Sequence, residues 1–253
     1  MLKTHGRYDY SAITKRPDYS FPGGRRLAVH LSLNVEHFAF GEGLGNDYGA
    51  PHPQPNTRSY AWRDYGNRVG AWRLLEFANE YDLPYALLVN TELYDYCPEM
   101  IAAFSERGDE IVGHGRTDSE RQADMNYEQE RACIFEATAA IEKHEGKKPL
   151  GWLAPYISQT HDSLELVSRR TPSRLYYACL IDQFDEMLRE SERRPLVMPI
   201  VLHSFVVGQP YRLRQFRRVI EHILKYRDRV WITRPGEICR FIESLPASIV
   251  PGS

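Results

Sequence analysis

Apolar runs along the chain predict six β-strands, which are Leu27–Val35, Tyr85–Asn90, Glu110–Gly115, Pro149–Pro155, Pro195–His203 and Arg229–Thr233. Between them, apolar residues recur at helical spacing. The helices expected from this spacing are Asn67–Tyr81, Pro98–Gly108, Asn126–Lys143, Ser173–Arg189, Leu213–Tyr226 and a last one from Pro235 to about Leu245. Strands that alternate with helices predict the α/β class, with parallel strands joined by crossover helices.

The first strand has two distinct faces. One is wholly apolar, with Leu27, Val29, Leu31, Leu33 and Val35, while the other carries small or polar residues. An open, doubly wound sheet would have two apolar faces, so this strand favours a barrel with a polar inner face. Glu36 would then face the barrel interior at the carboxyl end of the strand, where the active sites of such barrels lie.

Length and composition narrow the class of protein. The 253 residues suit one α/β barrel, so we expect a single domain over residues 1–253. A net charge of −2 argues against a partner such as nucleic acid or an anionic membrane, which would need a basic excess. The four cysteines are far apart in the sequence, so we expect free thiols in a reducing compartment. With no apolar leader or membrane-length run in the sequence, we expect a cytoplasmic enzyme.

A long stretch between the first strand and the first helix, Phe40–Asp64, is rich in Gly, Pro and Asn. Loops of this length are usually lids, binding loops or disordered segments. The segment GEGLGN within it is not followed by a helix, so it does not indicate a dinucleotide site.

Polar residues with catalytic chemistry follow three of the predicted strands. Glu36 and His37 follow the first, the run from His114 to Asp118 follows the third, and His203 ends the fifth. Zinc binds imidazole nitrogen and carboxylate oxygen and can leave one position open for water. A carboxylate can deprotonate that water, and a histidine can protonate a leaving nitrogen.

The order of these motifs, NVEHF, GHGRTD, GWLAPY and LHSF, resembles the polysaccharide deacetylase superfamily. Its pattern is TFDDG, H-[ST]-x-x-H, R-x-P-[YF], D-x-x-D-W and L-x-H in a distorted, TIM-like (β/α)7 barrel, which the resemblance implies here. Glu36 falls on the catalytic base and His203 on the histidine of L-x-H. Leu153 replaces the arginine of R-x-P-[YF].

The resemblance also implies a metal centre. His37 falls on the family's first metal-binding aspartate, and His114 and Asp118 fall on the two histidines of its second motif. The expected ligands are therefore His37, His114 and Asp118, with zinc as the expected divalent metal. Members of the branch described next also include proteins that look metal-independent.

The departures from the family pattern resemble one branch of it, the allantoinase-like enzymes and bacterial cyclic imide hydrolases. The first motif of that branch is N-[VIY]-E, and SYAWRDYGNRVGAWRLLE, IDQFDEML and LHSFVVGQPYRLR are similar to the cyclic imide hydrolases. This implies a hydrolase of the C–N bond in a cyclic amide, with Glu36 as general base and His203 as general acid. A polysaccharide N-deacetylase, an allantoinase and an inactive barrel used as a binding or structural subunit remain alternatives.

Further polar and aromatic residues are candidates for binding a small-molecule substrate. Arg63, Asp64 and Arg68 line the mouth of the barrel or pair with one another. Arg116 suits a substrate carbonyl or a carboxylate product. Trp152 and Tyr156 are expected to form the floor of the pocket. The resemblance also suggests a homo-oligomer.

The connection after the fourth strand does not fit a regular repeat. Thr160–Val167 reads as the start of a helix, and SRRTPS then begins another helix, with no strand between them. A right-handed βα repeat should place a strand there, and the resembling family has one. Either one βα segment is missing near Val167, or the sequence omits a segment.

Overall fold

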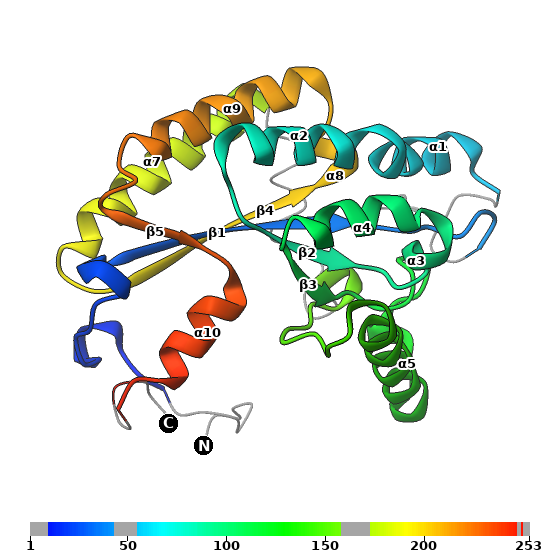
Figure 1. Ribbon diagram of the computed structural model, residues 1–253, viewed down its shortest axis with the longest axis horizontal. Coiled ribbons are helices and arrows are strands. Elements are labelled where there is room, and N and C mark those ends of the chain that lie inside the picture. Colours follow the sequence, from blue (N-terminus) through cyan, green and yellow to red (C-terminus); the bar gives the residue numbers. More distant parts are fainter. Residues whose placement is uncertain (1–9, 43–54, 158–172, 247–248, 250–253) are drawn as a thin grey trace.

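The computed structural model describes residues 10–42, 55–157, 173–246 and 249. Within these residues one parallel sheet is formed by β1 (Leu27–Val35), β2 (Tyr85–Val89), β3 (Glu110–Gly113), β4 (Leu196–His203) and β5 (Val230–Thr233). The strands run through the middle of the molecule, with helices outside them (Figure 1). This confirms the predicted α/β class with parallel strands.

Strand β1 is the centre of the sheet. It pairs with β4 over Leu27–Asn34, while β5 pairs with its first four residues and β2 with its last five. Strand β3 continues the sheet beyond β2. Since β5 and β2 share one edge of β1, the sheet divides there. Among the described strands, β3, β4 and β5 each pair with a single neighbouring strand.

The helices follow the sheet in the expected alternation. Those of the described residues are α1 (Thr57–Tyr65), α2 (Ala71–Tyr81), α3 (Leu93–Tyr96), α4 (Pro98–Glu106), α5 (Tyr127–Glu145), α7 (Ser173–Ser191), α8 (Ser204–Val207), α9 (Pro210–Leu224) and α10 (Pro235–Glu243). A π-helical segment, Gly66–Gly70, joins α1 to α2. None of the described helices has the length and apolarity that crossing a bilayer requires.

The two faces predicted for β1 are present. Leu27, Val29, Leu31, Leu33 and Val35 lie in the main hydrophobic core, which α2, α4, α7 and α9 also supply. On the other face, Ser32 and Asn34 are buried polar residues, and Asn34 donates a hydrogen bond to the carbonyl of Leu202. Alternation along one strand therefore separates a packed helical side from a polar inner side.

Two sequence predictions differ from the structure. The loop expected over Phe40–Asp64 already contains α1 from Thr57, because the side chain of Asn56 accepts a hydrogen bond from Ser59 N and caps that helix. The strand expected over Pro149–Pro155 is reduced to one parallel bridge between Trp152 and Gly113. The connection near Val167 lies outside the described residues.

The π-helical segment allows an unusually close contact with α8. A Cβ at Gly70 would lie 2.1 Å from the carbonyl oxygen of Ser204, and one at Gly208 would lie 2.3 Å from the Cα of Gly70. Only glycine permits this approach. Because α8 begins directly after His203, this packing fixes the end of β4 against the start of α2.

Candidate active site

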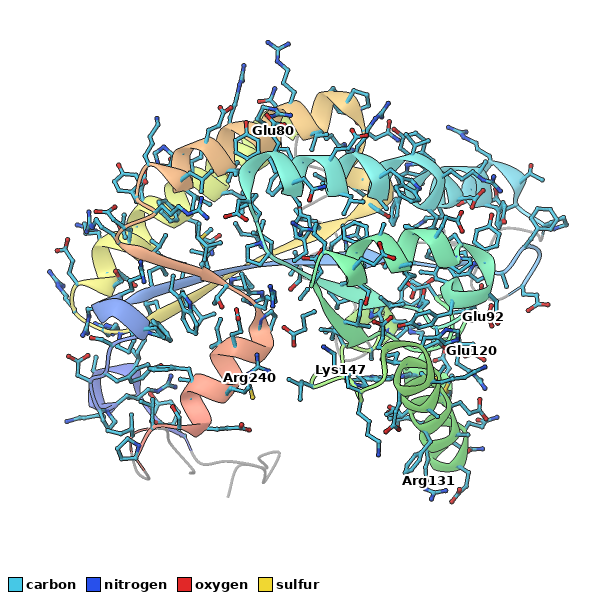
Figure 2. All side chains as sticks on the ribbon, in the orientation of Figure 1. Glu80, Glu92, Glu120, Arg131, Lys147 and Arg240 are labelled. Atoms are coloured by element: carbon cyan, nitrogen blue, oxygen red, sulfur yellow. The ribbon has the colours of Figure 1, made fainter. Side chains whose placement is uncertain are left out.

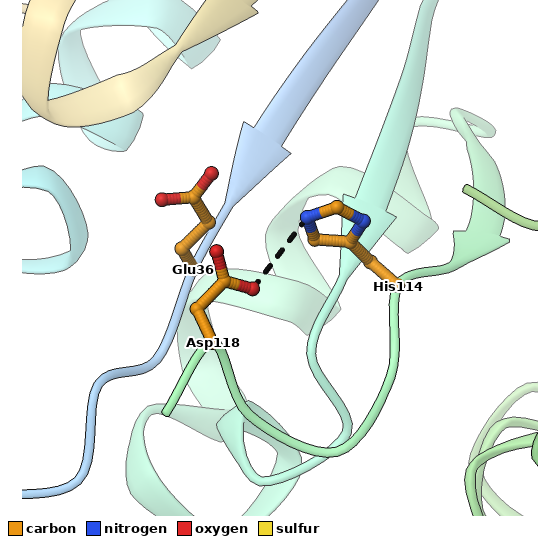
Figure 3. A group of neighbouring side chains, drawn as sticks. All are labelled: Glu36, His114 and Asp118. Carbon is orange, nitrogen blue, oxygen red and sulfur yellow. Dashed lines mark ion pairs between the residues drawn. The ribbon is translucent and has the colours of Figure 1, made fainter. Parts of the chain in front are cut away.

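Four polar residues gather at the carboxyl edge of the sheet. Glu36 follows β1, His114 and Asp118 follow β3, and His203 ends β4. Carboxyl ends of parallel strands share one edge, so residues distant in sequence meet there. Figure 3 shows Glu36, His114 and Asp118 turned toward one another; all are buried, and one donor atom from each lies within 4.8 Å of the others.

Glu36 lies between His203 and Arg63, and its side chain is only 5% exposed. Its Oε1 lies 3.2 Å from His203 Nε2, and its Oε2 lies 3.8 Å from Arg63 Nη1. Burial alone would raise the pKa of Glu36, but His203 and then Arg63 outweigh burial, so the pKa lies below its ordinary value. Glu36 is therefore an ionised carboxylate in a buried site.

The ring of His114 has a defined tautomer. Its Nδ1 lies 2.5 Å from the carbonyl oxygen of Leu153, which can only accept, so Nδ1 carries the proton. Burial lowers the pKa of His114, which keeps the ring neutral. The unprotonated Nε2 then faces Asp118 Oδ1 at 3.5 Å, the contact marked in Figure 3. Two acceptors at this distance need a proton or a cation between them.

Asp118 is positioned by hydrogen bonds from several segments. Its Oδ1 accepts from Asn90 Nδ2 at 3.0 Å, and its backbone N–H donates to the carbonyl of His37 at 2.8 Å. The hydroxyl of Tyr156 donates to the carbonyl of Asp118 at 2.9 Å. Burial, and next the charge of Glu36, raise the pKa of Asp118 well above its ordinary value. Of the two buried carboxyl groups, Asp118 is thus the one that takes up a proton more readily than Glu36.

Asn90, which the sequence analysis did not single out, connects these segments. Fully buried after β2, it donates to the carbonyl of His114 at 2.5 Å as well as to Asp118, and its Oδ1 accepts from His37 N at 2.8 Å. Its signal in the sequence is an amide directly after the apolar run YALLV. The sequence predicts it as the last residue of the strand Tyr85–Asn90.

The donor set suits a divalent metal. Two carboxylates and an imidazole nitrogen without a proton are ligands that such ions take. Of the three ligands expected from the sequence, His114 and Asp118 come together, with Glu36 as their neighbour. His37 lies apart, because its ring packs on Tyr96 at 4.9 Å between centroids and its Nε2 lies 3.4 Å from Glu92 Oε2.

The two arginines expected to bind substrate pair with carboxylates instead. Arg68, with 68% of its side chain exposed, contacts Asp64 and donates to the hydroxyl of Tyr96. Arg116 bonds to Glu120 through two nitrogens and to Glu136 through a third. Glu120 lies at the same end of the molecule as Glu92 (Figure 2). Both guanidinium groups are thus already paired within the protein.

Trp152 and Tyr156 lie beside the His114–Asp118 loop. The indole of Trp152 covers Gly113, where a Cβ would meet it at 2.5 Å, and its Nε1 donates to Gln122 Oε1 at 3.5 Å. Tyr156 adopts a positive φ of 62°, an uncommon conformation for this residue type. Tyr156 thus lies next to Asp118 through its hydroxyl, whereas Trp152 packs on Gly113 at the end of β3.

A small hollow opens in front of Glu36. It is lined by Glu36, His37, Phe38, Tyr60, Arg63, Asp64 and Asn67. Most of these residues come from α1, the π-helical segment and the end of β1. These residues surround the carboxylate of Glu36 at the carboxyl edge of the sheet.

Comparison with known proteins gives one consistent family. Residues 56–171 match the polysaccharide deacetylase family. A Schizosaccharomyces pombe protein named as a candidate polysaccharide deacetylase is 23% identical over 286 aligned positions, covering 86% of each chain.

Two solved structures show the same fold. A probable polysaccharide deacetylase from Pseudomonas aeruginosa PAO1 aligns with a TM-score of 0.75 and 22% identity, over 89% of this chain and 93% of that one. The PuuE allantoinase aligns with a TM-score of 0.75 and 23% identity, over 94% and 98% of the two chains. The family match over residues 56–171 and the fold shared with these structures together support the polysaccharide deacetylase superfamily.

Proposed function

We propose that the protein is a hydrolase that opens the C–N bond of a small cyclic amide, with cyclic imides as the first substrate class to test. The observation that carries the proposal is the buried Glu36 carboxylate, which lies 3.2 Å from His203 at the edge of the sheet. One group can accept a proton there and its neighbour can donate one. This is what hydrolysis of an amide requires.

In the proposed reaction, Glu36 accepts a proton from the attacking water. The water oxygen adds to the substrate carbonyl carbon, and the C–N bond then breaks. His203 protonates the leaving nitrogen, since its side chain is 43% exposed and its Nε2 lies 3.2 Å from Glu36 Oε1. The ring opens to a carboxylate and an amide, so one water is consumed for each ring.

His114 and Asp118, with Glu36 beside them as the base, would hold a divalent metal, and we propose zinc. When bound, such an ion lowers the pKa of water and polarises a carbonyl. The chain itself contributes the fixed tautomer of His114, through Leu153, and the orientation of Asp118, through Asn90. These hydrogen bonds hold the donor atoms in place before a metal or substrate arrives.

The choice of a cyclic substrate is supported by two features. The first motif reads NVE, as in the branch that acts on cyclic amides, and Leu153 stands where the deacetylases have arginine. The allantoinase structure also aligns over almost the whole of both chains. Deacetylation of an amino sugar is the second candidate, favoured by the family match over residues 56–171.

A substrate panel tests the proposal. The purified chain, treated with EDTA and then supplied with Zn²⁺ or buffer, is given succinimide, hydantoin, allantoin and an N-acetylglucosamine oligomer. We expect ring opening, measured as carboxylate product by chromatography. We also expect the rate of ring opening to fall about 100-fold or more in His203→Gln.

His222→Gln is the matched control. His222 also pairs with a carboxylate, Asp185, but on the outer surface between α7 and α9, so its replacement should leave turnover unchanged. Release of acetate without ring opening would favour the second candidate. A folded chain with neither activity would contradict the proposal and favour an inactive barrel.

A further inference from the structure

Arg63 is a charged residue buried in an aromatic cage. Its side chain is 3% exposed, and its guanidinium carbon lies 4.8 Å from the ring centroid of Phe38, 5.1 Å from that of Trp62 and 4.3 Å from that of Phe205. Aromatic faces attract a cation but do not replace a counter-charge. A buried guanidinium of this kind is costly unless an anion lies close to it.

The anion is Glu36. Arg63 Nη1 lies 3.8 Å from Glu36 Oε2, while His203 lies at the other oxygen. At 3.8 Å the contact is an ion pair without a direct hydrogen bond. The carboxylate of Glu36 therefore has a partner on each side, the buried guanidinium of Arg63 and the partly exposed ring of His203.

Three elements combine to fix this cation in place. Arg63 comes from the last turn of α1, and Asn67, one turn later, donates to the carbonyl of Glu36 at 2.8 Å. Phe205 of α8 reaches Arg63 because Gly66 and Gly70 allow α8 to approach closely. Since Phe205 follows His203 by two residues, the same packing fixes the positions of the aromatic cage and of His203.

We propose that Arg63 is a positioning residue for Glu36. It fixes the orientation of the carboxylate toward the hollow and supplies its counter-charge, and it acts through Glu36 without touching the reacting atoms. The cage keeps the guanidinium from turning to solvent. This inference rests on the proposed function, since it assigns Arg63 a task in that reaction.

Chemical rescue tests the inference. We expect Arg63→Ala to lower kcat about 10- to 100-fold, as loss of an organising contact does, while KM changes less than about threefold. Guanidinium or methylguanidinium at non-denaturing concentration should restore part of the lost kcat, because the ion can enter the vacated cage. Sodium chloride at equal ionic strength and neutral urea should not.

Arg107→Ala is the matched control. Arg107 is also largely buried, pairs with Asp109 and lies over the ring of Tyr85, but far from the hollow in sequence and on another element. Its replacement should lower the midpoint of thermal unfolding. Added guanidinium should not raise the kcat of this variant. A wild-type kcat in Arg63→Ala, or a loss that no guanidinium restores, overturns the inference and leaves the proposed function intact.

A thermal double-mutant cycle tests the coupling between Arg63 and Glu36 without measuring turnover. It therefore gives a result even if none of the substrates reacts. Arg63→Met should lower the midpoint of unfolding by about 5 °C or more, because it leaves a buried carboxylate without its cation. Adding Glu36→Gln should recover part of that shift. Strictly additive midpoint shifts in the two single variants and the double variant would mean that the two residues are not coupled, and would overturn the inference.

Discussion

Replacement of Asn90 by alanine should damage both the stability and the activity of the protein. Three buried groups would lose their hydrogen-bond partner, namely the N–H of His37, the carbonyl of His114 and the carboxyl of Asp118. Each buried polar group left unsatisfied costs about 1–3 kcal/mol. Allowing for water in the vacated space, the free energy of unfolding should fall by about 3–5 kcal/mol.

For a domain of this size, such a loss lowers the midpoint of thermal unfolding by about 10 °C. Urea unfolding followed by circular dichroism would give the free energy, and ring-opening turnover would report the site. Asn34→Ala is the matched control, since Asn34 is an equally buried amide on β1 that donates one described hydrogen bond, to Leu202. It should cost about 1–2 kcal/mol. If Asn90→Ala is no more harmful than Asn34→Ala, the reasoning about this network is refuted.

Three further outcomes follow from local contacts. Gly70→Ala should lower the free energy of unfolding by about 1–3 kcal/mol, because the added Cβ would meet the Ser204 carbonyl. The variant should also turn over substrate more slowly, because α8 is displaced. An unchanged midpoint of unfolding would refute the close contact. Arg116→Ala should change kcat less than about threefold, since Glu120 and Glu136 already occupy its guanidinium, and a loss above tenfold in steady-state kinetics would show a direct substrate contact. Glu237 accepts from Thr233 and from the start of α10. These contacts outweigh burial and lower its pKa below the ordinary 4.5, so its stabilisation is present above that pH and is lost as pH falls through the folded value. Glu237→Gln should therefore lower the unfolding midpoint at pH 7, and its effect should shrink as the pH is lowered below 4.5; an effect that does not change with pH would contradict this.

Much of the fold could be predicted because its signals are local. The apolar alternation of β1 separates the core face from the inner face, and Asn126 and Gly146 bound α5 as the caps predict. Helix α1 was missed because its buried residues, Ser59 and Arg63, are polar and give no apolar stripe. The Pro149–Pro155 run was read as a strand, but its prolines flank a segment that makes only one bridge.

The candidate site could be predicted only in part. Motif order placed Glu36, His114, Asp118 and His203 at strand ends, and the structure brings these four together. The side-chain direction of His37 depends on Tyr96 and Glu92, which lie more than fifty residues away in sequence. The role of Arg63 likewise depends on Phe205, a contact that no local pattern encodes.

The most direct test of the account is the kinetics of Glu36→Gln in ring opening. Glutamine keeps the size of the side chain but cannot accept the proton from water. We predict that kcat falls about 100-fold or more while the variant remains folded by circular dichroism. A folded Glu36→Gln variant that opens the ring at the wild-type rate would contradict the central claim that this carboxylate activates water.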